Sequence, residues 1–271
     1  MHRSALIAAL AIVAASCGST ARPTAAAPEV TRARGWETVF ADDFDGASLD
    51  PTKWSSCYWW STTNCTNAAN HELQVYTPDN VSFDDDSLVL TARRRNTVFD
   101  GRNHAYTSGL VSGSAPDGTL FGFRYGYVEA RARVPRGAGL WSALWLLDAG
   151  RTPLPEIDVF EVVGETPDLA YTAVHVADDR GERRRLRQRS RTADLSDGFH
   201  VFGLLWQPGE LRWYVDGREE WRVDDPAFVP ATDMYLIANL AVGGDFPTEV
   251  RSDTPFPSSY EVDYIRVWQR R

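Results

Sequence analysis

The fold can be read from residues 127–134, whose sequence is YVEARARV. Valine and alanine occupy every even position of this stretch, while tyrosine, glutamate and arginine occupy every odd position. A period of two is typical of a β-strand that has one face in a core and the other face outside it. The stretch therefore predicts a strand within a sheet.

Alternating or apolar runs recur on both sides of this stretch and predict further strands. They cover residues 72–77, 87–94, 141–147, 156–163, 171–177, 200–207, 211–215, 234–242 and 260–269. Turn sequences separate the runs, and Asp216-Gly217 between two of them predicts a tight hairpin. Strands do not alternate with helices, so we predict an all-β antiparallel sandwich or barrel. An inward-curved sheet in such a fold would form a concave cleft for a substrate.

The composition is that of an acidic globular protein. The 271 residues carry 28 Lys and Arg against 37 Asp and Glu, a formal net charge of −9. Binding to nucleic acid needs a basic face, so this balance argues against a nucleic-acid partner. Hydrophobic residues make up 43% of the chain, too few for a multi-span membrane protein. The 10 Trp, 10 Tyr and 12 Phe suit strands and also surfaces that stack on flat ligands.

The first residues have the pattern of an export signal. Residues 1–17 read MHRSALIAALAIVAASC, with Arg3 before an apolar run that is too short to span a bilayer. The sequence around Cys17 is similar to a bacterial lipobox, which predicts a signal peptide and a lipidated Cys17. An ordinary signal that is cut nearby is the alternative. We expect an exported protein, lipid-anchored at the bacterial cell surface or otherwise secreted, with this anchor as its only membrane contact.

The rest of the chain divides into a tether and a domain. Residues 18–35 are rich in Ala, Pro and Thr and predict a flexible tether, and residues 36–271 form one domain. Within the domain, Cys57 and Cys65 predict a short-loop disulfide because an exported chain meets an oxidising compartment. A pair of reduced thiols is the alternative. No His or further Cys lies at ligand spacing around them, which argues against zinc.

The most informative segment is residues 155–161, with the sequence PEIDVFE. Glu156 and Asp158 are two residues apart and share one face of a strand. Glu161 lies five residues after Glu156 and would face the other way in a regular strand. One extra residue around Val159-Phe160, a β-bulge, would return Glu161 to the shared face, and bulges are common beside active sites. We predict this bulge; the alternative is that Glu161 faces away.

Three carboxylates on one face suit glycoside hydrolysis. Retaining glycosidases hold two carboxyl groups about 5–5.5 Å apart, so that one attacks the sugar. Like charges this close separate the two pKa values, which leaves one group ionised and the other protonated. A calcium site and a solvated edge strand are the alternatives. The interleaved Ile, Val and Phe argue against both, because they belong in a core rather than in a calcium loop.

The acid cluster and its companion motifs resemble glycoside hydrolase family 16, the endo-acting retaining β-glycanases that include bacterial laminarinases. The resemblance covers essentially the whole domain. It is carried by ADDFDG at 41–46, NHELQVYT at 70–77, YGYVEAR at 125–131, GLWSALW at 139–145, EIDVFE at 156–161, FH at 199–200, WYVDG at 213–217, NLAVGG at 239–244 and VDYIRV at 262–267.

The resemblance implies a jelly-roll β-sandwich of two curved antiparallel sheets. It also implies that Glu156 is the nucleophile, Glu161 the general acid/base and Asp158 the supporting carboxylate. In this family, two residues between Asp158 and Glu161 are the spacing of laminarinases and agarases, and the resemblance to the laminarinases favours an endo-acting hydrolase of β-1,3-glucan. The alternatives are a transglycosylase, a hydrolase of mixed-linkage glucan, agar or carrageenan, and a non-catalytic carbohydrate-binding module.

Five further residues are candidates for substrate binding. Trp141 and Trp145 alternate onto one strand face, where they would stack on sugars or pack in the core. Asn70 and Glu72 follow a loop rich in Asn, Thr and Trp, and would bind sugar hydroxyls or simply begin a strand. His175 would contact the substrate, steady a carboxylate or serve as an ordinary structural residue.

The remaining expectations concern ions, charge and partners. The family often binds one structural calcium, and Asp43 and Asp263 near the ends of the domain are its candidate ligands here. No cofactor is expected for catalysis. Residues 180–191, RGERRRLRQRSR, carry seven arginines; contact with an anionic glycan is one interpretation, but a solvated hairpin face is favoured. We expect a monomer that acts on a polysaccharide.

Overall fold

The computed structural model describes residues 35–61, 64–84, 87–247 and 249–271. The predicted signal peptide at 1–17, its Cys17, and the predicted tether at 18–35 except Gly35 lie outside the described residues. No helix within the described ranges is long and apolar enough to cross a membrane. The domain consists of β-strands, loops and short 3₁₀ helices, namely η2 Ala68–Asn70, η3 Pro78–Asn80 and η4 Pro226–Phe228.

Two large sheets form the two layers of the fold. The first has ten strands: β1 (Trp36–Asp42), β2 (Gln74–Tyr76), β3 (Val81–Asp84), β4 (Ser87–Phe99), β5 (Arg102–Ser108), β9 (Gly126–Arg133), β14 (His200–Gln207), β15 (Glu210–Val215), β16 (Arg218–Val223) and β18 (Ser258–Arg270). The second has six: β6 (Leu110–Ser112), β10 (Leu140–Asp148), β11 (Glu156–Val163), β12 (Leu169–Ala177), β13 (Arg183–Arg191) and β17 (Met234–Val242). A small ribbon joins β7 (Ser114–Ala115) and β8 (Gly118–Thr119).

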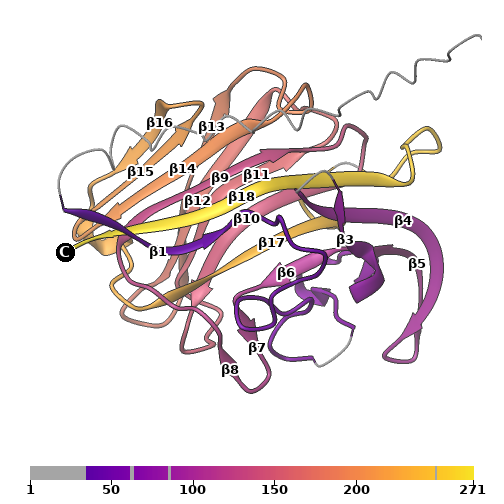
Figure 1. Cartoon of the computed structure of the whole chain (residues 1–271), viewed down its shortest axis with the longest axis horizontal. Helices are drawn as coiled ribbons and strands as arrows, with labels where there is room; N and C mark the ends of the chain where they lie inside the picture. Colours follow the sequence, from indigo (N-terminus) through magenta and orange to yellow (C-terminus); the bar gives the residue numbers. More distant parts are fainter. Residues whose placement is uncertain (1–34, 62–63, 85–86, 248) are drawn as a thin grey trace, which may run out of the picture.

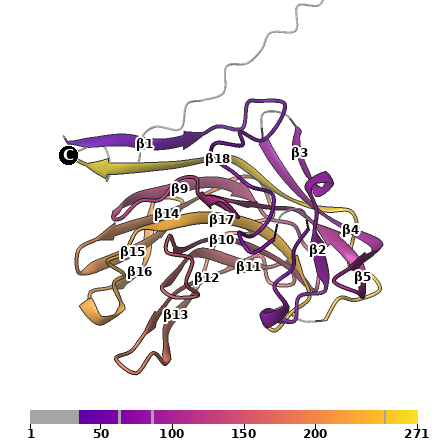
Figure 2. The ribbon, with the colours of Figure 1, turned by 90° about the horizontal axis from the view of Figure 1, so that it is seen from below.

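The strand order differs from the chain order in both sheets. The larger sheet runs β16-β15-β14-β9-β18-β4-β5-β2, with β1 on β18 and β3 on β4 (Figure 1). The smaller sheet runs β13-β12-β11-β10-β17-β6, and Figure 2 shows it as a separate layer beside β9 and β18. Pairs of described strands are antiparallel, as predicted, except for β2 with β5, which is parallel.

The core lies between the two layers. Val128, Ala130 and Ala132 of β9 are fully buried there, as the alternation of that strand predicts. From the other layer, Phe160 of β11 stacks on Phe202 of β14 with ring centroids 3.8 Å apart. Full burial of a large apolar side chain stabilises the fold by about 1.5–3 kcal/mol relative to exposure. Contacts of this kind hold the two sheets together.

The predicted strands are present, but β4 continues to Phe99 beyond the predicted 87–94, and β2 covers only Gln74–Tyr76 of the predicted 72–77. β11, β14 and β17 match the predicted ranges 156–163, 200–207 and 234–242 residue for residue. Asp216 and Gly217 form the predicted hairpin between β15 and β16, both with the positive φ that a type I′ turn needs. The structure confirms the predicted all-β jelly-roll sandwich.

Candidate active site

A β-bulge interrupts β11 at the acid cluster. Asp158 pairs with Ala173 of β12 and Glu161 pairs with Tyr171, so three steps along β11 face two steps along β12. The pairing of β11 with β10 on its other side skips Val159. Val159 is therefore the extra residue, and the predicted bulge is confirmed.

The bulge sorts the side chains of β11 onto two sides. Ile157 and Phe160 are fully buried in the core, and Val159 is nearly so. The acidic side chains instead line a groove on the outer face of the six-stranded sheet: Glu156, Asp158 and Glu161. The acids that the sequence singled out are therefore brought together on one face.

A contact from the opposite layer supports the bulged segment. Trp213 of β15 donates its indole N–H to the backbone carbonyl of Asp158 at 2.8 Å. The Trp213 side chain is completely buried. A buried carbonyl without a partner would be costly, so this bond stabilises the irregular backbone beside the acids.

The groove is large, and aromatic, acidic and basic side chains line it. Its volume is about 1120 Å³, which is above the roughly 300–1,000 Å³ typical of small-molecule pockets. Side chains of β10, β11, β12 and β17 form its floor, β13 lies along one side, and loops supply the rest. Among its polar and aromatic residues are Tyr58, Trp59, Trp60, Asn70, Glu72, Trp141, Trp145, His175, Arg183, Arg185, Arg187, Asn239 and Phe246. A groove of this size and lining suits a segment of a polymer.

His175 of β12 connects an arginine to the acids. Arg183 of β13 donates its Nε–H to His175 Nδ1 at 2.9 Å. Because an arginine nitrogen can only donate, Nδ1 accepts and the ring proton is on Nε2. That Nε2 lies 3.3 Å from Glu156 Oε1 and 3.3 Å from Asp158 Oδ2. Burial is the main cause that lowers the pKa of His175, to about 4, which agrees with a neutral ring at pH 7.

Burial raises the pKa of all three acids. The pKa of Glu156 rises to about 7, because burial and the charge of Asp158 outweigh His175 and Arg183. Burial also raises the pKa of Asp158 to about 7, against the nearby arginines of β13. The pKa of Glu161 rises well above its usual value, because it is buried and faces both other acids. The cluster therefore holds protons at neutral pH, and Glu161 is the acid best placed to keep one.

The same cluster is compact enough to hold a metal ion, but its surroundings do not fit one. The ligand atoms of Glu156, Asp158 and His175 lie within 4.8 Å of one another, the one such group found among the described residues. Arg183 already donates to Glu156 Oε1 at 3.0 Å and to His175. A cation bound there would be repelled by that guanidinium. The set of groups favours proton transfer instead.

Trp141 and Trp145 of β10 both line the groove rather than the core between the sheets. Trp145 donates its indole N–H to Asn239 of β17 at 2.8 Å. Trp141 packs edge-on against Phe246, with centroids 5.4 Å apart. Its N–H lies near Glu161 and favours the charged form of that acid, although it makes no hydrogen bond of normal geometry.

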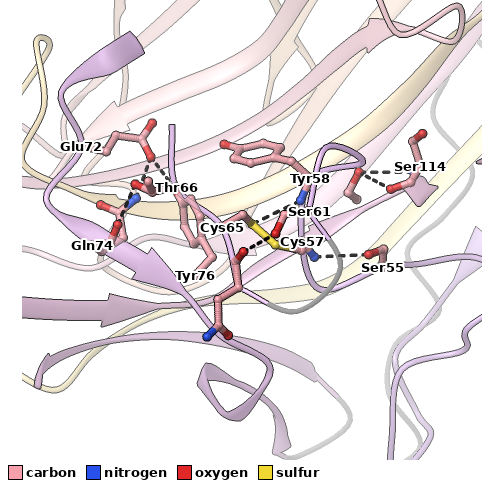
Figure 3. The surroundings of a disulfide bond; sticks show 12 residues. Ser55, Cys57, Tyr58, Ser61, Cys65, Thr66, Glu72, Gln74, Tyr76 and Ser114 are labelled. Atoms are coloured by element: carbon pink, nitrogen blue, oxygen red, sulfur yellow. Dashed lines mark hydrogen bonds between the residues drawn. A yellow bond between two sulfur atoms is a disulfide. The ribbon is translucent and has the colours of Figure 1, made fainter. Parts of the chain in front are cut away.

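Asn70 and Glu72 line the groove, but Glu72 is held by protein partners. Its carboxylate accepts hydrogen bonds from Gln74 at 2.6 Å and Tyr76 at 3.1 Å (Figure 3). It also accepts one from Asn70 at 3.2 Å. Burial raises the pKa of Glu72 to about 7 despite these bonds. Asn239 donates to the Tyr76 hydroxyl at 2.9 Å. Glu72 is thus part of a network under the groove, and Asn70 is the more available of the two for a sugar.

A disulfide closes a loop beside the groove. Cys57 and Cys65 are bonded, with Cα atoms 5.8 Å apart (Figure 3). Tyr58, Trp59 and Trp60 follow Cys57 and line the groove. Tyr58 stacks on Trp60 with centroids 4.2 Å apart, and Trp60 is 46% exposed. An exposed, supported ring of this kind is suited to stacking on a sugar.

The arginine-rich segment also borders the groove, although a solvated hairpin face was the favoured interpretation of its sequence and contact with a glycan the other. Arg183, Arg185 and Arg187 are exposed, but they are exposed to the groove. The favoured interpretation of residues 180–191 as a solvated hairpin face is therefore incomplete. A signal was present, because arginine at every odd position from 183 to 191 has the period of a strand face. No comparable signal pointed to Phe246.

The predicted calcium ligands are each held by an arginine. Arg266 donates to Asp43 Oδ1 at 2.9 Å, and Arg131 donates to Asp263 Oδ2 at 2.6 Å. A calcium ion would have to compete with both guanidinium groups for these oxygens. The contacts therefore give no support to calcium at this position, which stays a prediction.

Comparison with protein families and curated proteins gives consistent matches. The model described as "Glycosyl hydrolases family 16" matches residues 68–266. Endo-1,3-1,4-beta-glycanase EglC of Rhizobium meliloti (strain 1021) is 34% identical over 245 residues, which cover 85% of this chain and 51% of that protein. Beta-glucanase of Rhodothermus marinus is 32% identical over 266 residues, which cover 88% of this chain and 87% of that protein. The chain thus spans about half the length of the first of these relatives.

The fold is also similar to solved structures. The catalytic domain of an endo-1,3-beta-glucanase (laminarinase) from Thermotoga petrophila RKU-1 matches with a TM-score of 0.75 and 28% identity. The match covers 87% of this chain and 98% of that one. Likeness of the fold therefore extends over essentially the whole described domain.

Proposed function

The chain belongs to glycosyl hydrolases family 16, and from this membership we propose that it is an endo-acting β-glucan hydrolase that retains the anomeric configuration. The observation that carries the proposal is the bulge in β11, which leaves three acids of raised pKa side by side along the groove. A groove, unlike a closed pocket, accepts an internal segment of a chain, as endo-action requires.

A β-1,3-glucan is the substrate that we propose first. The Rhodothermus marinus relative is named a beta-glucanase, and the Thermotoga petrophila structure is of an endo-1,3-beta-glucanase. The Rhizobium meliloti relative is named an endo-1,3-1,4-beta-glycanase, so mixed-linkage glucan is the second substrate to test. The aromatic rings along the groove would stack on successive sugars of either polymer.

In the proposed first step, Glu161 gives its proton to the glycosidic oxygen while a carboxylate oxygen of Glu156 attacks the anomeric carbon. The bond from that carbon to the leaving oxygen breaks, and a glycosyl ester forms on Glu156. Burial and two acidic neighbours favour the protonated form of Glu161. Arg183 and His175 favour the ionised form of Glu156. The two environments therefore suit an acid and a nucleophile.

In the second step, Glu161 takes a proton from water as that water attacks the anomeric carbon. The ester bond breaks, Glu156 leaves as a carboxylate, and Glu161 is again protonated. Two displacements at one carbon restore its original configuration. His175 Nε2 lies 3.3 Å from both Glu156 and Asp158, so when Glu156 loses its charge in the ester, the N–H of that ring is left to Asp158.

The direct test is the configuration of the first product. Proton NMR during hydrolysis of laminarin should detect the β-anomer of the new reducing end before mutarotation, and the α-anomer first would contradict retention. A panel of lichenan, xyloglucan, agarose and carrageenan ranks other substrates. Binding without any cleavage would indicate a carbohydrate-binding module, and products longer than an added oligosaccharide would indicate transglycosylation.

We also propose that the protein is exported and lipid-anchored through Cys17. The support is the sequence of residues 1–17, in which a charged start and a short apolar run precede the cysteine. An anchor followed by the tether would hold the domain at the cell surface, where a polysaccharide too large to cross a membrane is accessible.

A further inference from the structure

β13 is the edge strand of the six-stranded sheet, and its groove face is wholly basic. Alternate residues of a strand share a face, and Arg183, Arg185 and Arg187 line the groove. The two further positions of that face, Arg189 and Arg191, are also arginine. The opposite face has one arginine, Arg184, followed by Leu, Gln and Ser. A strand that needed charge only for solvation would not concentrate it on the groove side.

The register places this row close to the acids. Arg185 pairs with His175 of β12, which in turn pairs with Glu156 of β11. Neighbouring strands lie about 4.8 Å apart, so the backbones of Arg185 and Glu156 are separated by roughly 10 Å. The long arginine side chain shortens that gap further. A group on a sugar bound beside the cleaved bond is within its reach.

The three groove arginines differ in their partners. Arg183 bonds to Glu156 and His175. Arg187 lies over the rings of Phe246 and Tyr171, 5.0 and 5.6 Å from their centroids, which holds its planar group in place. Arg185 is exposed along the groove and acts electrostatically on Asp158 and His175, but it has no hydrogen bond or ion pair among the described residues. Its guanidinium is therefore open toward the groove.

From this arrangement we infer that β13 forms a subsite for a negatively charged substituent, a carboxylate or a sulfate, on a sugar bound next to the cleavage point. The inference rests on the proposed glycan hydrolase function and refines its substrate. Arg185 would be the principal ligand, because a guanidinium presents paired N–H groups that match the oxygens of either anion. Arg187, fixed by two rings, would be the second ligand.

A neutral glucan gives these residues no matching partner. Its hydroxyls can accept single hydrogen bonds, but they cannot compensate the charge of a guanidinium that loses water on binding. An anionic group supplies that compensation and gains charge-assisted bonds. The groove should therefore discriminate in favour of charged chains, and the discrimination should weaken as salt screens it.

The test compares laminarin with carboxymethyl-laminarin and laminarin sulfate of matched chain length. The full chain with Glu156→Gln is used, so that substrate is bound without turnover, and affinity electrophoresis measures Kd at several NaCl concentrations. Both charged glucans should bind about tenfold more tightly than laminarin, equivalent to about 1.4 kcal/mol. Adding Arg185→Gln should lower this affinity ratio about tenfold, and Arg185→Lys should recover part of it.

Arg184→Gln is the matched control, because it removes the same charge from the opposite face of β13 and should leave the ratio unchanged. Equal affinity for neutral and charged glucans, or equal effects of Arg184→Gln and Arg185→Gln, would overturn the inference. Equally tight binding of polyacrylate would overturn it too, because it would reveal an unspecific polyanion surface. Tighter binding of one derivative supports it and identifies the anion.

Hydrolysis of neutral laminarin and lichenan by the unmodified chain is measured in parallel. Absence of hydrolysis of both laminarin and lichenan contradicts the proposed function, whereas the binding ratios decide the charged subsite by themselves. The two proposals can therefore fail separately.

Discussion

The three acids of β11 have different surroundings, and the difference determines the role proposed for each. Burial raises the pKa of Glu156 to about 7, but the hydrogen bond from Arg183 at 3.0 Å and the nearby His175 Nε2 oppose that rise and favour its ionised form. The charged form of Glu161 is disfavoured, because this side chain is buried and faces the other two acids. One protonated and one ionised carboxyl group at neutral pH is the combination that double displacement needs.

Replacing the proposed nucleophile tests this division of roles. Glu156→Gln should lower kcat on laminarin by on the order of 10⁴-fold or more, because an amide cannot form the glycosyl ester. Glucan binding should persist, since the groove lining is otherwise unchanged. Reducing-sugar release and affinity electrophoresis measure the two effects. Turnover near that of the unmodified protein, in a preparation free of other glucanases, would refute the assignment.

The contact of Arg183 with Glu156 predicts a change in pH dependence. Arg183 lowers the pKa of Glu156, although burial is the larger influence and raises it to about 7. Without that positive charge the pKa rises further, and less of the enzyme has an ionised nucleophile at a given pH. Arg183→Gln should therefore move the acidic limb of the kcat/KM profile to higher pH, so that activity falls more at pH 6 than at pH 8.

Arg183→Lys is the control for this pH prediction. It keeps the charge but loses the planar fork, so it should move the limb less than Arg183→Gln does. The pH at which kcat/KM falls reflects the titration of the interacting acids together and not of Glu156 alone. Parallel profiles for all three proteins, differing only in height, would show that Arg183 acts on the fold and not on the charge of the nucleophile.

At this scale the sequence could predict the acids but not their partners. The shared face follows from local alternation, and the spacing of Glu161 required an irregularity in the strand. The bond between Arg183 and His175 depends on which strand lies beside β12, and that is decided by pairing rather than by the segment itself. The same limit applied to Glu72, whose carboxylate is taken by Gln74 and Tyr76.

Among the elements, the loop closed by Cys57 and Cys65 positions one wall of the groove. It carries Tyr58 and Trp60, stacked on each other, next to the strand that bears Tyr76. Loops lose order more readily than paired strands, so an aromatic wall on a loop needs a constraint if it is to be preorganised. The disulfide supplies that constraint.

Removal of this disulfide should weaken both stability and substrate binding. The double substitution Cys57→Ala and Cys65→Ala should lower the free energy of unfolding by about 2–3 kcal/mol, the value expected for a loop of this length. KM for laminarin should rise while kcat changes less, because the acids lie on β11 and not on the loop. Urea unfolding and steady-state kinetics measure these effects, and an unchanged KM would show that the wall does not bind substrate.

The elements themselves were predictable to different degrees. β11, β14 and β17 are bounded by turn residues and have strong apolar patterns, so their ends could be located from the sequence. β13 lacks apolar residues at most positions, so alternation of apolar residues does not reveal it as a strand. Only the alternation of its arginines does. Pairing order was not predictable, because β1 lies on β18 at the other end of the chain and β9 lies between β14 and β18.

For the whole molecule, the sandwich separates a structural sheet from a functional one. The ten-stranded sheet contributes core residues such as Phe202 and the Trp213 bond behind the bulge. The six-stranded sheet contributes its inner face to that core and its outer face to the groove. The all-β class could be predicted from periodicity alone, and the jelly roll was implied by the family resemblance.

The predicted lipid anchor would determine where the whole molecule is located. Cys17→Ser should move the protein from the membrane fraction to the soluble fraction of a bacterial host, because the acceptor of the lipid is lost. Glucan hydrolysis per molecule should be unchanged, since the domain begins beyond the tether. Incorporation of labelled palmitate and cell fractionation measure the effect. Absence of the palmitate label from the protein that retains Cys17 would contradict lipidation.

The position of β13 at the border of its sheet has a consequence for solubility. An edge strand exposes, on the side without a neighbour, backbone N–H and C=O groups that could recruit the same strand of another molecule and extend the sheet. Two such strands brought together would face each other with arginine at most positions, and this electrostatic repulsion opposes the association. The arginines would therefore protect each copy from aggregation through this edge strand, even when many copies are crowded together on one surface.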